Sequence, residues 1–360
     1  MVRRVLLLAA LAACGDNDTP EVCGAQNGVM CQRLSSWQLF DDIAAQTPAA
    51  GVMPYDINTP LFSDYATKQR FLVLPPGGVA TWSDADAFEL PAGSVLVKTF
   101  SYLHDRRDPS LGSTLLETRV LVKGDKGWHG AAYVYDDGGT DAHLQVAGTI
   151  RSESWIHDDG STRTDDYVVP NANQCKNCHA EHDNVTSLLG PKARHMNKNG
   201  QLEAMVAAGQ LAGAPDPMTW PKAPDAFDPA SGTLEQRARA WLDINCGHCH
   251  NPRGAARTSG LFLDIAQTDP AVFGVCKPPV ATGRGSGGLQ FDIVPGSPDD
   301  SILVYRISST DPEVRMPELG RNLVHAEGVA LIREWITSMT GGCTGWTSGH
   351  GQPASQPARL

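Results

Sequence analysis

The sequence predicts an α+β multidomain fold, in which an N-terminal antiparallel β-rich domain is followed by mainly α-helical domains. Two observations support this fold class. Within residues 36–168, short β-branched segments alternate with glycine-rich turns, as in antiparallel sandwiches and barrels. After residue 169, apolar residues recur at helical spacing instead. A chain of 360 residues is long enough for two or three domains.

The predicted strands are runs of β-branched and aromatic residues. Each run is followed by a turn that contains glycine, proline or aspartate, which favours hairpin connections. These runs cover residues 71–74, 94–100, 118–122 and 131–135.

Two helices are predicted in the second half of the chain. Thr233 and Gln236 form a capping-box pattern at the start of an amphipathic stretch, residues 234–248. A second apolar stripe covers residues 329–339. Residues 214–232 are rich in proline, alanine and aspartate and are expected to form a linker.

The N-terminus has the features of a bacterial lipoprotein signal. Arg3 and Arg4 precede nine apolar residues at 5–13, which are too few to cross a bilayer. Small residues stand directly before Cys14, so we expect cleavage at this cysteine and acylation of its thiol. An ordinary signal peptide with an incidental cysteine is the alternative. Loss of the two arginines would change the formal net charge from −11 to −13, and such an acidic chain does not suit nucleic acid.

The nine cysteines fall into three groups. Cys14 is assigned to the lipid, and four cysteines lie in C-x-x-C-H motifs at residues 175–179 and 246–250. The even remainder favours disulfides in an oxidising compartment. Their pairing is left open, although Cys23 is close in sequence to Cys31, and Cys276 belongs to the same C-terminal domain as Cys343.

The two C-x-x-C-H motifs predict covalent attachment of two haems. The thiols of such a motif form thioethers with the haem vinyl groups, and the following histidine lies under the iron. A zinc ribbon is disfavoured because the motifs are 71 residues apart, and a redox dithiol needs no histidine. The expected attachment residues are Cys175, Cys178, Cys246 and Cys249, with His179 and His250 as proximal ligands.

The second motif is followed by the parts expected of a class I cytochrome c. A helix leads into the motif, a methionine stands on a proline-bounded turn, and a closing helix comes last. Met316 is therefore the expected sixth ligand of the second haem, with packing of an apolar gap as the alternative. For the first haem the spacing leaves several ligands open, and a five-coordinate iron is a further possibility. The candidates are Met196, His195, Met205 and Met218.

Four segments carry a family resemblance. Residues 55–64, 168–175, 237–242 and 315–320 resemble motifs of a largely uncharacterised family of bacterial dihaem c-type cytochrome lipoproteins. The resemblance extends over residues 35–340 and implies haem binding, export and domain order, but no substrate. Leucine is common at position 196 in that family, which implies core packing for Met196.

These patterns divide the chain into six segments. They are a lipoprotein signal peptide at 1–13, a tether at 14–35, a β-rich domain at 36–168, a first haem-binding segment at 169–220, a class I cytochrome c-like domain at 230–343 and a disordered tail at 344–360.

The predicted function is electron transfer by an exported dihaem c-type cytochrome, anchored by lipid at the periplasmic or outer-membrane face of the cell envelope. The expected partner is a small basic cytochrome or an envelope oxidoreductase, because complementary charge raises encounter rates. One alternative is a dihaem peroxidase-like enzyme, in which His195 or Glu181 acts at an open first haem. Another is a haem sensor whose β-rich domain binds a ligand through aromatic residues, namely Trp82, Trp128, Tyr133 and Tyr135.

Replacing Cys14 with serine should move the protein from the membrane fraction to the soluble fraction. Stable anchoring needs more than one acyl chain, and the substitution removes the residue that would carry them. Fractionation and the mass of the mature N-terminus check this expectation. A Cys14→Ser protein that is processed normally and stays in the membrane would contradict it.

Overall fold

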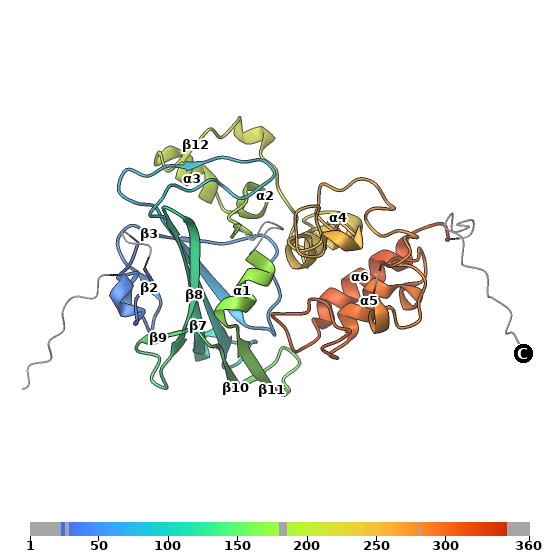
Figure 1. Cartoon of the computed structure of the whole chain (residues 1–360), viewed down its shortest axis with the longest axis horizontal. Helices are drawn as coiled ribbons and strands as arrows, with labels where there is room; N and C mark the ends of the chain where they lie inside the picture. Colours follow the sequence, from blue (N-terminus) through green and yellow to red (C-terminus); the bar gives the residue numbers. More distant parts are fainter. Residues whose placement is uncertain (1–22, 26–28, 180–185, 281, 344–360) are drawn as a thin grey trace, which may run out of the picture.

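The computed structural model describes residues 23–25, 29–179, 186–280 and 282–343. A β-rich part and a part with short helices stand side by side, with α1 (Ala172–His179) between them (Figure 1). The predicted signal peptide, Cys14, Glu181 and the tail at 344–360 lie outside the described residues. Within the described ranges, no helix combines the length and the apolar character needed to cross a membrane.

The β-rich part is built on a six-stranded antiparallel sheet in the order β3-β4-β6-β7-β8-β9. The four predicted runs overlap β4, β6, β7 and β8. The strands of this sheet are β3 (Val52–Tyr55), β4 (Thr67–Val73), β6 (Val95–Leu103), β7 (Ser113–Gly124), β8 (Gly127–Tyr135) and β9 (Ala142–Gln145).

The two faces of this sheet differ in chemistry. Phe71, Val97 and Val120 lie opposite one another on neighbouring strands and form a core with Trp37 and Tyr133. Because successive side chains of a strand alternate between faces, the residues between them point to the other face. That second face carries charged residues in addition to apolar ones, and it is the face on which helices pack.

Three smaller pairings complete the β structure. An antiparallel hairpin of β10 and β11 leads directly into α1, and β5 pairs with β12 in parallel. The disulfide between Cys23 and Cys31 closes the N-terminal segment against the core of the main sheet. The remaining strands are β1 (Phe40–Asp42), β2 (Thr47–Pro48), β5 (Ala80–Thr81), β10 (Thr149–Ile156), β11 (Thr162–Val169) and β12 (Leu211–Ala212).

The predicted fold class, with mainly α-helical cytochrome c-like domains after the β-rich domain, is wrong. The six α-helices of the described part have only 4 to 13 residues, and turns and loops make up most of the chain after α1. Glycine and proline recur through these loops and disfavour helix interiors, while the disulfide between Cys276 and Cys343 holds the loops in place. The other helices are α2 (Ala193–Met196), α3 (Gln201–Ala207), α4 (Leu234–Leu242), α5 (Ile302–Ser308) and α6 (Ala326–Ser338).

The helix expected over residues 234–248 is shorter than predicted. It ends at Leu242, where a π-helical turn, η4 (Asp243–Gly247), takes over. The start of α6 packs on α4, with Gly328 against the ring of Trp241. A Cβ atom on Gly328 would lie 2.5 Å from that ring, so only glycine allows this close approach.

A buried ion pair joins α2 to η4. Asp243 accepts two hydrogen bonds from the Arg194 guanidinium, at 2.9 and 3.0 Å, and it lies 2.8 Å from Nε2 of His195. Its second oxygen also accepts the backbone N–H of Ile265. These hydrogen bonds outweigh burial and lower the pKa of Asp243, which therefore stays ionised.

Replacing Asp243 with asparagine should lower the free energy of unfolding by about 3 to 5 kcal/mol, because Arg194 would remain buried without its counter-ion. The control is to replace Asp299, whose pair with Arg333 is exposed, with asparagine. This change should lower the free energy of unfolding by about 0 to 1 kcal/mol. Urea unfolding measures both. The pKa of Asp243 in the folded protein is below its ordinary value. The stabilisation by this ion pair is therefore complete at neutral pH and declines only below about pH 4. Equal effects of the two substitutions would contradict the assignment.

Candidate haem-binding site

α1 positions the first C-x-x-C-H motif. Asn171 Oδ1 accepts the backbone N–H of Gln174, and Gln174 Oε1 accepts the backbone N–H of Asn171, both at 2.9 Å. This reciprocal cap fixes the first turn, and three-residue spacing then brings Cys175 and Cys178 to the same side of the helix. The sequence analysis missed this cap, although asparagine and glutamine at this spacing were a readable signal.

The second motif follows α4. The predicted capping box is confirmed, because the Thr233 side chain accepts the backbone N–H of Gln236 while the Gln236 side chain accepts that of Thr233. α4 leads into η4, which contains Cys246, and π-helical turns are frequent at functional sites. Burial raises the pKa of the Cys246 thiol to about 12, so this thiol is protonated at neutral pH.

The cysteines separate into two classes. The pairs Cys23–Cys31 and Cys276–Cys343 form disulfides. The four cysteines of the C-x-x-C-H motifs are free thiols. These four are the cysteines that the sequence analysis assigns to thioether bonds, so the structure leaves them available for that chemistry.

Both motif histidines are oriented in the same way. Nδ1 of His179 lies 3.2 Å from the carbonyl oxygen of Ser187, and Nδ1 of His250 lies 3.2 Å from that of Leu261. A proton on Nδ1 that is donated to a carbonyl leaves the Nε2 lone pair free for a metal. Burial lowers the pKa of each histidine to about 4, so both rings are neutral at pH 7.

The second motif borders a cavity of about 320 Å³, a size typical of cofactor and ligand pockets. Cys246, Cys249 and His250 lie on its border, and Met316 reaches it from the loop between α5 and α6. The predicted sixth ligand therefore borders the same space as the predicted proximal ligand. Apolar side chains that line this cavity include Leu261, Leu263, Ile302, Leu303 and Ile307.

Arg321 fixes the loop that carries Met316. It is 4% exposed, and its Nε donates a hydrogen bond of 2.9 Å to the carbonyl oxygen of Met316. Its other nitrogens donate to the carbonyl oxygens of Leu323, Ser309 and Arg306. The sequence analysis missed this positioning residue, because nothing in the local pattern identifies which loop carbonyls a distant arginine will reach.

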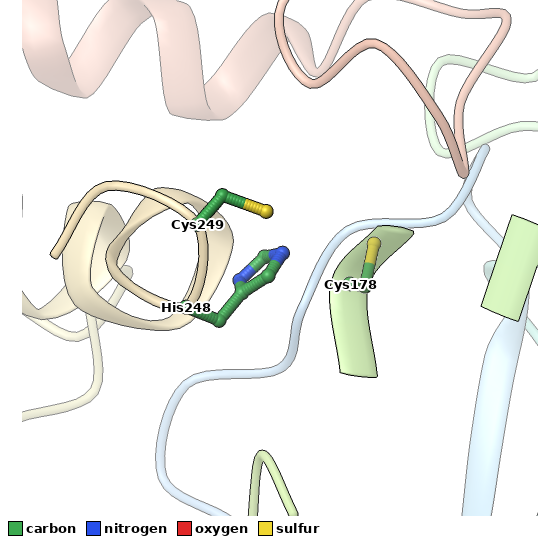
Figure 2. A group of neighbouring side chains, drawn as sticks. All are labelled: Cys178, His248 and Cys249. Carbon is green, nitrogen blue, oxygen red and sulfur yellow. The ribbon is translucent and has the colours of Figure 1, made fainter. Parts of the chain in front are cut away.

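The two motifs meet in space. Cys178 lines the same cavity as the second motif, and the ligand atoms of Cys178, His248 and Cys249 all lie within 4.8 Å of one another. Figure 2 shows His248 and Cys249 on one helical turn beside α1, which carries Cys178. A hydrogen bond from the Cys249 thiol lowers the pKa of Cys178. Any groups attached to Cys178 and Cys249 would thus be neighbours.

The candidate ligands for the first haem have other partners. His195 is buried with Nε2 on Asp243, and Met196 is 0% exposed in an apolar cluster that includes Leu202 and Met205. Met218 is 91% exposed. A ligand role for His195 or Met196 would require the side chain to leave these contacts, and the sixth ligand of the first haem stays a prediction.

The arrangement of donors suits two haems better than one zinc ion. A zinc site at Cys178, His248 and Cys249 would have three protein ligands and would leave both motif histidines unused. Haem attachment uses all four free thiols and both neutral histidines, and it accounts for the apolar cavity beside Met316. The residues present therefore fit haem.

Replacing Met316 with alanine should abolish the weak sulfur-to-iron charge-transfer band of the oxidised protein and lower the potential of one haem, because a thioether ligand raises it. Replacing the exposed Met218 with alanine is the control and should leave both unchanged. Absorption spectra and a redox titration measure the two quantities. An unaltered band in the Met316→Ala protein would assign the ligand elsewhere.

Comparison of the chain with protein-family models, with curated proteins and with solved structures found no match.

Proposed function

We propose that this chain is a c-type cytochrome with two covalently attached haems, which transfers electrons at the cell envelope of its host. We further propose that it is exported and held at the membrane through lipid on Cys14. The haems would be bound through Cys175 and Cys178 and through Cys246 and Cys249. When bound, haem supplies an iron that alternates between two oxidation states.

The observation that carries this proposal is the convergence of the two motifs. Cys178 and Cys249 are 71 residues apart in the sequence, yet their sulfur atoms lie within 4.8 Å of each other. A chain that only stored two separate cofactors would have no need for this contact. Neighbouring attachment points provide a short path between two redox centres, which supports electron transfer.

The residues of the chain prepare the two centres for this role. His179 and His250 each hold one proton on Nδ1 and keep Nε2 free, so neither has to lose a proton on binding iron. Leu261, Leu263 and Ile302 give the cavity beside the second motif an apolar lining that suits a haem ring. Arg321 holds the Met316 loop in one position, which limits rearrangement between redox states.

The alternatives gain less support. His195, the candidate acid–base group of a peroxidase-like enzyme, is buried on Asp243. In the sensor alternative, Tyr133 and Tyr135 are 0% and 4% exposed, and their hydroxyls are hydrogen-bonded in the core. Trp82 and Trp128 pack against the cluster around α2 and α3. These aromatic residues are better explained as core residues than as a ligand-binding surface.

We expect rapid electron exchange with a small basic cytochrome, slowed by about tenfold or more as ionic strength rises, because the formal net charge of the chain is −11.

Intact mass should first show two haem additions that survive acid–acetone extraction. Stopped-flow absorption then measures exchange at several salt concentrations. A double Cys175→Ala, Cys178→Ala variant is the matched control and should retain one addition.

Three results would contradict the proposal. The first is a protein without covalent haem that contains one zinc ion per chain. The second is catalytic consumption of peroxide by the half-reduced protein, which would favour the enzyme alternative. The third is exchange that is slow at every ionic strength.

A further inference from the structure

Four cations lie together on one face of the main sheet. Arg70 on β4, Lys98 on β6 and Arg119 on β7 are directly opposite one another in the strand register. Directly opposed residues point to the same face, with Cβ atoms about 4.5 to 5.5 Å apart, and like charges at such positions are destabilising. Lys68 lies two residues before Arg70 and therefore shares this face. We refer to Lys68, Arg70, Lys98 and Arg119 as the cation row.

Carboxylates of the protein neutralise the cation row only in part. Arg119 forms a bidentate pair with Glu117. Arg70 has one contact of 4.0 Å with Asp56, which Lys198 binds more closely at 2.7 Å. Among the described residues, no carboxylate oxygen lies within 4.0 Å of the amine of Lys68 or Lys98. Lys68 and Lys98 are left without an ion-pair partner. Burial and the neighbouring cations lower the pKa of both lysines, that of Lys98 to about 7, and a bound anion would restore their positive charge.

Arg70 gives a second, independent sign of a missing anion. Its side chain is 5% exposed, and its Nη2 atom is buried without a hydrogen-bond partner in the described part of the chain. Buried guanidinium donors without acceptors are costly, so such a group normally has a ligand. The cationic groups of Lys68, Lys98 and Arg119 lie 4.4 to 5.6 Å from the centroid of the Phe100 ring. This ring supplies no hydrogen-bond acceptor for Nη2 of Arg70.

The cation row lies beside the first haem motif. α1 contacts β8, which is the strand next to Arg119 in the sheet, and Figure 1 shows α1 alongside these strands. Burial is the main cause that lowers the pKa of His179, and the nearby Lys98 and Arg119 lower it further. Burial raises the pKa of Cys175, and the nearby charge of Arg119 opposes that rise. The cation row therefore belongs to the surroundings of the first motif.

We infer that the cation row is an anion site that binds the two propionate carboxylates of the haem attached at Cys175 and Cys178. This inference rests on the proposed function. The two lysines without an ion-pair partner match the two carboxylates that one haem carries, because a bound carboxylate favours the charged form of each amine. A guanidinium with a free donor also suits a carboxylate. A small oxyanion such as inorganic phosphate presents the same chemistry, and the experiment below separates the two sources.

The test replaces Lys98 with glutamine in the full protein. Loss of a cation beside the first haem favours its ferric form, so the potential of that haem should fall while that of the second stays unchanged. The first haem is identified as the redox transition that Met316→Ala does not move. Lys126→Gln removes the same charge from the exposed turn between β7 and β8 and should move neither potential. Lys68→Gln provides a second variant should Lys98→Gln fold poorly.

Inorganic phosphate at constant ionic strength separates the two anion sources. If propionates occupy the row, phosphate leaves the first-haem potential of the wild-type protein unchanged. In the Cys175→Ala, Cys178→Ala protein, which lacks that haem, phosphate should then raise the melting temperature, and Lys98→Gln in this background should abolish the rise. A first-haem potential that moves with phosphate in the wild type would overturn the propionate assignment.

Failure of the inference and failure of the proposed function give different results. Unchanged first-haem potentials in Lys98→Gln and Lys68→Gln proteins that carry two haems by mass would overturn the anion site alone. A wild-type protein without haem at the first motif would overturn the proposed function. In that protein, a phosphate-dependent melting temperature that Lys98→Gln abolishes would still support an anion site.

Discussion

The buried carboxylate of Asp243 is the interaction on which the arrangement of the two motifs depends. It lies three residues before Cys246, and it binds Arg194 and His195 from the segment that follows the first motif. A buried charge of this kind tolerates little displacement, because each partner would be left uncompensated if the other moved. The ion pair thus holds η4, and with it the second motif, at a fixed position against α2.

The loop between β3 and β4 adds a second set of hydrogen bonds between the β-rich part and the second half of the chain. Asn245 Oδ1 accepts the backbone N–H of Phe62, and the Asp64 carboxylate accepts the backbone N–H groups of Asn322 and Leu323. Thr59 accepts the backbone N–H of Ala226. Loops with little helix or strand leave backbone groups to be satisfied, and here Asp64 and Thr59 of the β-rich part satisfy those of the second half. The β-rich part therefore serves as the framework on which the irregular second half is built.

Charge is distributed unevenly between the surface and the interior. The chain as a whole is acidic, with a formal net charge of −11, whereas the sheet face beside α1 presents four basic side chains. The motif histidines are neutral because burial lowers their pKa. The net negative charge of the chain would favour the proposed basic partner, and the basic side chains beside α1 would favour the proposed anionic ligand.

Local chemistry was readable in the sequence, and long-range contacts were not. The C-x-x-C-H motifs, the capping box at Thr233 and Gln236 and the main strands follow from residues close together in the chain. The extent of helix was overestimated, because apolar spacing after residue 169 does not reveal that loops replace most helical turns. The meeting of Cys178 with Cys249 and the alignment of Arg70, Lys98 and Arg119 depend on strand register and on the packing of α1. Only the tertiary structure decides these two contacts, because each brings together residues that are far apart in the chain and follow no helix or strand period.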